Sequence, residues 1–521
     1  MRTHLPLLLS LLADLAVANS KSFESKCNDI ARDMQTGYAT INFVQYLPAG
    51  STINHTAEGL NATCVSSSAP PMPVALCRVG LHVPTSSSSY VLIEAWLPEK
   101  WESRLLSTGN SATGGCIDYP QMAYGASFGF ATVGTNNGHN GSSAGAFFHQ
   151  PEVLKDFSWR ALYTGAVIGK ETTKKFYDCE DFKSYHIGCS TSGRQLFDGI
   201  VSGAPVINND GLVSWYGYAL ETVLGANTSD SYLTPENWKL VHEEVQKQCD
   251  ALDGAADGIL EDTRRCKLDS KPLYCLTSNR PGCLSTPQVF AMEQIFSPFV
   301  YGNTYLHPGA AHGDETSFSE GIYSSIPITF LVEGFRFIFY NDLSWEPSRF
   351  TPLDALKVVQ ANPGDLHTFN PNLTAFRDRG GKILHWHEQS DALASVRNSD
   401  WYYDLVLNTT TSGNVASLDE FYRYFRISGT YHCGGGPGAN FIGQSGLARK
   451  EKPEDNVLLA IVDWVEKGTA PEYVRGVKFV DDEPEKGVVF TRRHCKHPLT
   501  NIYNGRAGNG TDEDGWRCVE K

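Results

Sequence analysis

The stretch that most constrains the fold is residues 188–195, Gly-Cys-Ser-Thr-Ser-Gly-Arg-Gln. The apolar run at 185–187 before it is typical of a strand, and the apolar spacing after it predicts a helix over Thr191–Val201. A strand, a sharp turn carrying a serine and a helix together expose that serine as a nucleophile at the edge of a parallel sheet. Ser190 is therefore our candidate nucleophile.

Two other serines match the G-x-S-x-G pattern more closely, because Ser192 replaces its last glycine in the stretch around Ser190. Ser127 is followed by a strand-like run, 128–133, where a helix would be required. Ser143 lies in a Gly/Asn/Ser loop with no apolar strand before it. Context therefore favours Ser190.

A serine hydroxyl attacks efficiently only when a histidine takes its proton and a carboxylate orients that histidine. In α/β hydrolases the chain order is serine, acid, histidine, with the last two on loops after late strands. Asp391 and His432 follow predicted strands at 381–387 and 421–427. We predict a Ser190, Asp391, His432 triad, with Glu388 as the rival acid.

An oxyanion hole needs backbone N–H donors beside the nucleophile. The amide of Thr191 is the natural first donor. The second is expected from the loop Gly114-Gly115-Cys116, at Gly115, although a plain flexible turn explains this loop equally well. His385 and His387 alternate along one predicted strand, which suggests either a metal pair or ordinary polar positions.

The thirteen cysteines leave at least one unpaired. Pairing between near neighbours gives Cys249–Cys266, Cys275–Cys283 and Cys495–Cys518. Of the three arrangements open to the four N-terminal cysteines, we take Cys27–Cys77 with Cys64–Cys116. Cys189 and Cys433 then pair, and Cys179 is left free.

A Cys189–Cys433 disulfide would make neighbours of Ser190 and His432, since bonded cysteines have Cα atoms about 4.4–6.8 Å apart. The bond would thereby fix the distance between nucleophile and base. The alternative is a purely structural disulfide that happens to adjoin a serine and a histidine.

The N-terminus predicts a secretory signal over residues 1–18, with Arg2 and His4 before an apolar run and Ala16-Val17-Ala18 as a cleavage site. No later stretch reaches the length of a membrane span. Seven glycosylation sequons agree with secretion, at Asn54, Asn61, Asn140, Asn227, Asn372, Asn408 and Asn509. The formal net charge of -15 argues against nucleic acid or an anionic membrane as a partner.

Strand–helix alternation favours an α/β fold with a mainly parallel sheet. It covers residues 19–205 and returns over 381–521, so we predict that these two segments form one catalytic domain. Between them, 206–380 is rich in aromatics and cysteine-closed loops and is predicted to be an inserted lid domain. The alternative is ordinary core with long surface loops.

Three motifs together resemble the fungal tannase and feruloyl esterase family: Gly-Cys-Ser-Thr with Arg194-Gln195, His387 to Asp391, and His432-Cys433-Gly434-Gly435-Gly436-Pro437-Gly438. The match extends over nearly the whole mature chain. The resemblance implies an α/β-hydrolase fold with a lid, hydrolysis of phenolic esters, the triad and the Cys189–Cys433 bond. Ser192 departs from the family's glycine, where a side chain could crowd the turn or alter the acyl pocket.

The segment 249–259 places three aspartates among turn-forming glycines. Hard oxygen ligands suit Ca²⁺, but the spacing is not that of an EF-hand, and a solvated acidic turn is an equal alternative. The resemblance implies a structural calcium held by Asp250, Asp253 and Asp257 with the carbonyls of Ala255 and Ile259.

We thus predict a secreted serine esterase that releases hydroxycinnamic acids of the ferulic or p-coumaric type from plant cell-wall polysaccharides such as xylan. It would act as a monomer or homodimer. A tannase acting on galloyl esters is the close alternative. A secreted serine peptidase and an inactive sugar-binding relative are two further ones.

Overall fold

The computed structural model describes residues 22–33, 39–191, 196–275, 282–313, 315–316, 325–446, 451–505 and 509–520. The predicted signal segment and Ser192 lie outside these ranges. None of the described helices combines the length and the apolar composition that a membrane span requires.

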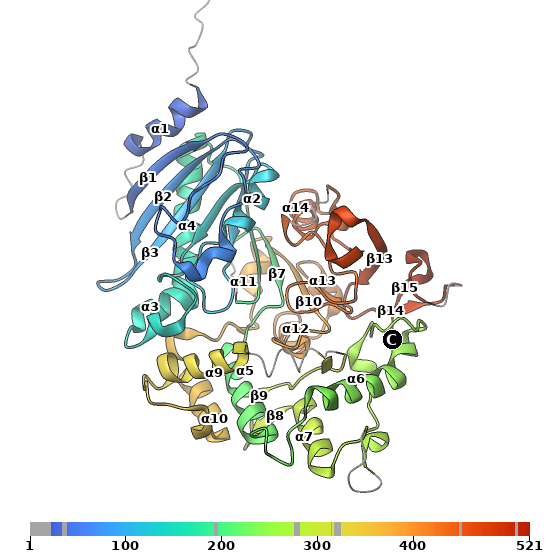
Figure 1. The fold of residues 1–521 in the computed structure, drawn as a ribbon. Coiled ribbons are helices and arrows are strands. Elements are labelled where there is room, and N and C mark those ends of the chain that lie inside the picture. The colour runs from blue at the N-terminus through green and yellow to red at the C-terminus, as the bar shows by residue number, and fades with distance from the viewer. Residues whose placement is uncertain are drawn as a thin grey trace, which may run out of the picture.

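A nine-stranded sheet forms the centre of the described chain, in the order β1-β2-β3-β5-β4-β6-β7-β10-β11 (Figure 1). Pairing is antiparallel from β1 to β5 and parallel from β5 to β11, so the sheet is mainly parallel as predicted. The strands are β1 (Thr40–Leu47), β2 (Leu76–Pro84), β3 (Tyr90–Pro98), β4 (Arg104–Thr108), β5 (Ala131–Thr135), β6 (Lys183–Cys189), β7 (Gly199–Gly203), β10 (Lys382–Glu388) and β11 (Tyr422–Ile427).

Helices cover both faces of this sheet. On one face, α2 (Tyr119–Ser127) packs on β3, β4 and β5, and α14 (Val457–Lys467) packs on β7 and β10. On the other face, α4 (Ala161–Tyr177) packs on β3, β4 and β5, and α12 (Val396–Thr411) packs on β10. Smaller helices flank these: α1 (Phe23–Asp33), α3 (Pro151–Lys155), α11 (Thr374–Asp378) and α13 (Val415–Asp419).

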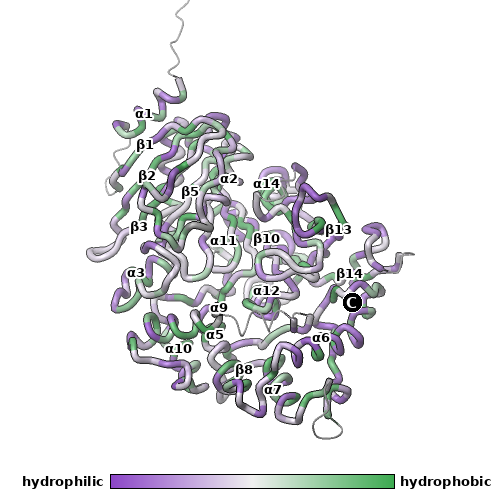
Figure 2. Tube along the Cα trace, viewed as in Figure 1, coloured by the Kyte–Doolittle hydropathy of each residue, from purple (hydrophilic) through white to green (hydrophobic). Residues whose placement is uncertain are grey.

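Most of the chain between β7 and β10 forms a separate helical layer in the lower part of Figure 1. Its largest apolar cluster is built almost entirely from its own residues, around Trp215, Trp238 and Trp345. Figure 2 shows hydrophobic stretches along α5 and α9 of this layer. Its elements are α5 (Asn209–Gly217), α6 (Pro235–Cys249), α7 (Thr286–Phe296), β8 (Phe299–Tyr301), β9 (Thr304–His307), α9 (Ser325–Glu333) and α10 (Pro352–Ala361).

Two hairpins follow α14 and lie outside the main sheet. They pair β12 (Tyr473–Phe479) with β13 (Val488–Cys495), and β14 (Thr500–Tyr503) with β15 (Trp516–Val519). All six expected disulfides are present: Cys27–Cys77, Cys64–Cys116, Cys189–Cys433, Cys249–Cys266, Cys275–Cys283 and Cys495–Cys518. Cys179 is free, and its thiol donates to the carbonyl of Asp181.

One local prediction is wrong and another is displaced. The helix expected over Thr191–Val201 does not form at its C-terminal end, because Gly199–Val201 belong to β7 and pair with β6 and β10. Residues 192–195 of that prediction lie outside the described chain. The strand expected at 128–133 begins only at Ala131, since Phe128 and Gly129 complete the turn that ends α2.

Candidate active site

Ser190 directly follows β6 and has a φ of 72°, a conformation that residues other than glycine rarely adopt. Its N–H donates to the Gly203 carbonyl at 2.9 Å, and its carbonyl accepts from the Val206 N–H at 2.8 Å. The chain that follows β7 therefore holds both backbone groups of this residue. A strained serine at the end of a central parallel strand is the geometry of a nucleophile elbow.

The expected acid and base contact each other directly. His432 Nδ1 lies 2.6 Å from Asp391 Oδ2, and the other carboxylate oxygen accepts the N–H groups of Leu393 and Ala394 at 2.9 and 2.8 Å. His387 Nε2 lies 3.3 Å from the same Oδ2 atom. The sequence did not reveal the two amide donors, although a tight turn after a strand is where such donors occur.

These contacts set the protonation of both groups. Burial alone would raise the pKa of Asp391, but the charges and hydrogen bonds of His432 and His387 hold it well below its usual range. Burial alone would lower the pKa of His432, yet the Asp391 carboxylate outweighs this and raises it. An ionised Asp391 thus orients and strengthens His432 as a base.

Glu388, the rival acid, is fully buried, and no described side chain donates a hydrogen bond to its carboxyl oxygens. Burial and the neighbouring Asp391 charge raise its pKa well above the ordinary value. A carboxyl group that favours its neutral form and makes no hydrogen bond to His432 is not placed to be the orienting carboxylate. The geometry therefore favours Asp391.

The Cys189–Cys433 disulfide joins the residues that adjoin Ser190 and His432, with Cα atoms 6.0 Å apart. Cys433 and Gly434 to Gly436 all have positive φ, which lets the chain turn sharply after His432. No hydrogen bond joins Ser190 to His432, both of which are described residues. Such bonds are often long until substrate binds.

Thr191 lies against the loop expected to complete the oxyanion hole. Its hydroxyl donates to the carbonyls of Ala112 and Asn110 at 3.0 and 3.3 Å. Gly115, however, donates its N–H to the Gly141 carbonyl at 2.7 Å and is not available as an oxyanion donor. The prediction of Gly115 as an oxyanion donor is therefore wrong. The sequence does not show which N–H groups of the loop form backbone hydrogen bonds within the folded protein.

The two alternative serines have other roles. Ser127 ends α2 and donates to the Tyr124 carbonyl, and Ser143 donates to Glu333.

His385 and His387 are buried and both contact the Ser399 hydroxyl. Among the described residues, His387, Glu388 and Asp391 form one of two groups whose possible metal-ligand atoms lie within 4.8 Å of one another. The other group comprises Glu388 and the bonded Cys189 and Cys433.

The three aspartates of the loop 250–259 do not form such a group in this structure. Each of them accepts backbone N–H groups of the same loop or of Glu261 just after it. Burial, with repulsion from Glu261 and Asp257, raises the pKa of Asp253 to about 7. Oxygen donors whose charges repel one another suit a hard cation, which would draw them together and remove the repulsion.

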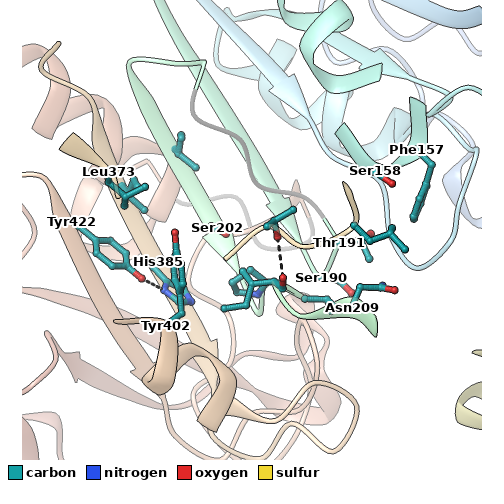
Figure 3. Close-up of a pocket in the computed structure, with 17 residues that line it drawn as sticks. Phe157, Ser158, Ser190, Thr191, Ser202, Asn209, Leu373, His385, Tyr402 and Tyr422 are labelled. Carbon is teal, nitrogen blue, oxygen red and sulfur yellow. Dashed lines mark hydrogen bonds between the residues drawn. The ribbon is translucent and has the colours of Figure 1, made fainter. Parts of the chain in front are cut away.

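A cavity of about 110 Å³ adjoins Ser190 and Thr191 (Figure 3). Its lining includes side chains of β7, β10 and β11 and residues close to both ends of the inserted helical layer. Apolar and aromatic side chains predominate in it. It offers a space of molecular size next to the nucleophile.

Comparison with known proteins places this chain in a family. The family model described as "Tannase and feruloyl esterase" matches residues 77–325 and 349–519. The chain is 41% identical over 529 residues to a probable feruloyl esterase B of Aspergillus clavatus, covering 98% of this chain and 99% of that protein. It is 40% identical over 540 residues to feruloyl esterase C of Talaromyces stipitatus, covering all of both.

Solved structures agree. The crystal structure of feruloyl esterase B from Aspergillus oryzae superposes with a TM-score of 0.88 at 40% identity, covering 96% of this chain and 100% of that one. Tannin acyl hydrolase from Aspergillus niger superposes at 0.72 with 20% identity, covering 95% of both chains, which shows a shared fold. The chain belongs to the tannase and feruloyl esterase family and has its α/β-hydrolase-type fold.

Proposed function

We propose that this protein is a secreted serine carboxylic-ester hydrolase that releases hydroxycinnamic acids from esters of plant cell-wall polysaccharide. The observation that carries the proposal is the Asp391–His432 pair, linked to Ser190 through the Cys189–Cys433 disulfide. Relatives named feruloyl esterase, similar over their whole length, support the substrate class.

The triad and the oxyanion donors divide the steps of the reaction between them. His432 takes the Ser190 proton as Oγ attacks the ester carbonyl, and the acyl–oxygen bond to the alcohol breaks. His432 then gives that proton to the departing alkoxide, which leaves an acyl group on Ser190. Water, activated by the same histidine, releases the acid. The Thr191 N–H, with a second donor from the Asn110–Ala112 segment, would stabilise the oxyanion.

Ester profiling tests which phenolic acid the enzyme releases. We expect hydrolysis of methyl ferulate and methyl p-coumarate to exceed that of methyl gallate by about 10-fold or more in kcat/KM. A preference for gallate would instead identify a tannase. Turnover of casein, if abolished together with ester hydrolysis in Ser190→Ala, would indicate a peptidase.

Features of the sequence and of the structure support the proposal that the protein is secreted. The predicted signal segment 1–18, six disulfides and seven sequons are typical of a protein that passes through an oxidising compartment. Six sequon asparagines are exposed and Asn61 is half-buried. Glycosidase treatment of the protein secreted by a fungal host should therefore lower its apparent mass.

Calcium is proposed as a structural ion of the loop 250–259. Asp250, Asp253 and Asp257 with the carbonyls of Ala255 and Ile259 would hold it. Glu261, just after the loop, accepts from Ser428 and Arg492, and its carbonyl accepts from Gln389. The ion would thus support the loop that carries Asp391 without taking part in the chemistry.

A further inference from the structure

A continuous chain of buried hydrogen bonds ends at Asp391. The Tyr422 hydroxyl lies 2.6 Å from His385 Nδ1 (Figure 3), and His385 Nε2 lies 2.8 Å from the Ser399 hydroxyl. The same hydroxyl lies 2.6 Å from His387 Nδ1, and His387 Nε2 lies 3.3 Å from Asp391 Oδ2. The four side chains that lead to Asp391 come from β10, β11 and α12, and each is at most 2% exposed.

One backbone carbonyl sets the direction of the donor next to Asp391. His387 Nε2 lies 2.6 Å from the Ala394 carbonyl, which can only accept, and the ionised Asp391 oxygen can only accept as well. His387 therefore carries a proton on Nε2 and donates it towards both acceptors. Ala394 also donates its N–H to the other Asp391 oxygen at 2.8 Å. His387 thus holds both the carboxylate and the turn to which the carboxylate belongs.

The other protons of the chain follow from this one. A neutral His387 ring accepts at Nδ1, so the single Ser399 proton points to it, and Ser399 Oγ accepts from His385 Nε2. Burial lowers the pKa of His385 well below its ordinary value, so this ring is neutral and accepts at Nδ1. Burial raises the pKa of Tyr422 well above its ordinary value, so the phenol keeps its proton and donates it to His385. Every donor of the chain then points towards Asp391.

A chain of this direction favours a negative charge at its end. Hydrogen bonds aligned head to tail polarise one another, and the low dielectric of the interior strengthens their effect. Asp391 is 1% exposed, so protein donors replace the water that would otherwise solvate its charge. The reaction needs this charge when His432 becomes an imidazolium. Mutual pairing of buried polar groups explains the bonds within the chain, but not why the chain ends on the orienting carboxylate.

We propose that His387 is a positioning residue of the active site, which holds the Asp391 carboxylate in place for His432. Ser399 supports it by fixing the orientation of the imidazole ring. The assignment rests on the proposed function, because it presupposes that Asp391 and His432 act on Ser190. His387 acts through Asp391 and does not touch the reacting atoms, so its loss should lower kcat more than it changes KM.

The first test removes the His387 donor and then restores it. In His387→Leu we expect kcat for methyl ferulate to fall about 10–100-fold, with KM changed less than about 3-fold, because a displaced carboxylate orients the base poorly. His387→Gln should recover most of the rate, since the glutamine amide can place an N–H close to the position of Nε2. Rates are divided by the fraction of enzyme that a fluorophosphonate probe labels to completion, which corrects for unfolded protein. Equal losses in both variants would overturn the proposal.

The second test uses Ser399→Ala and covers the case in which the His387 variants fail to fold. Ser399 is preferred because Tyr422 and His385 also line the cavity beside the nucleophile. We expect kcat to fall about 3–10-fold, the effect of one lost hydrogen bond. The matched control is Ser214→Ala, a fully buried serine of α5 whose hydroxyl has no hydrogen-bond partner in the described part of the chain. It should change kcat less than about 2-fold.

A double variant tests whether the chain acts as one unit. Adding Ser399→Ala to His387→Leu should cause no further loss of kcat, because Ser399 acts only through His387. Additive losses, or a Ser399→Ala rate equal to that of Ser214→Ala, would overturn the assignment while leaving the esterase activity in place. Absence of methyl ferulate hydrolysis in the wild type would instead contradict the proposed function.

Discussion

At the scale of single residues, two carboxyl groups three positions apart have pKa values shifted in opposite directions. Asp391 is surrounded by donors, namely two backbone amides and two histidines, and stays ionised. Glu388 is equally buried, but no described side chain donates to it, and burial with the Asp391 charge raises its pKa well above the ordinary value. Hydrogen bonding rather than burial therefore decides which of them supports His432.

This difference predicts unequal effects of two isosteric changes. Asp391→Asn should lower kcat by about 10³–10⁴-fold, because the amide neither stabilises the charged imidazole nor fixes its tautomer. Glu388→Gln should change kcat less than about 10-fold, since a neutral amide replaces a neutral acid. Methyl ferulate kinetics on folded variants measure both. A larger loss in Glu388→Gln would reverse the assignment of the acid.

At the scale of elements, local signals predicted the strands and helices whose sequences carry their own periodicity or caps. The strand expected at 381–387 is observed as β10 at Lys382–Glu388, and the one expected at 421–427 as β11 at Tyr422–Ile427. The apolar and aromatic residues of these two runs are sufficient there. These elements placed Asp391 and His432 after the correct strands.

Elements defined by distant partners were not predicted. The apolar spacing of Leu196 to Val201 fits a helix, but Gly199 to Val201 pair with β6 and with β10, which lies far along the chain. The hydrogen bond from the Gly115 N–H to the Gly141 carbonyl was likewise not predicted. Sequence periodicity gives no information on contacts between distant segments. Only the structure therefore shows the pairing of β7 and the hydrogen bond between Gly115 and Gly141.

The loop 250–259 gives the prediction at this scale. Chelation with EDTA should lower the melting temperature by several degrees, and added Ca²⁺ should restore it, because an ion bound only to the folded state stabilises it. Asp253→Asn should abolish the calcium response. Differential scanning fluorimetry with Mg²⁺ as the control ion measures it. A melting temperature that ignores both EDTA and Ca²⁺ would show that this loop is only an acidic turn.

At the scale of the whole molecule, the Cys189–Cys433 bond spans a sequence separation of 244 and joins the two halves of the sheet around the inserted helical layer. Long closed loops lose the most chain entropy in the unfolded state. In the proposed mechanism, the same bond also positions nucleophile and base. It would then combine a stabilising role with a catalytic one.

Its removal should show both effects. We expect Cys189→Ala/Cys433→Ala to lower the free energy of unfolding by about 2–5 kcal/mol and kcat/KM by about 10–100-fold. The control is Cys495→Ala/Cys518→Ala, whose separation is 23 and which lies in the C-terminal hairpins. That variant should lose stability with little change in kcat. Equal kinetic losses in both would deny the Cys189–Cys433 bond a special role.

The most direct test of the account compares wild type with Ser190→Ala on methyl ferulate, with Ser127→Ala and Ser143→Ala as controls at the two other pattern matches. We predict that wild type and both controls hydrolyse the ester and react with a fluorophosphonate probe. Ser190→Ala should lose at least about 10³-fold in rate and all labelling. A Ser190→Ala variant that retained the wild-type rate would contradict the central claim.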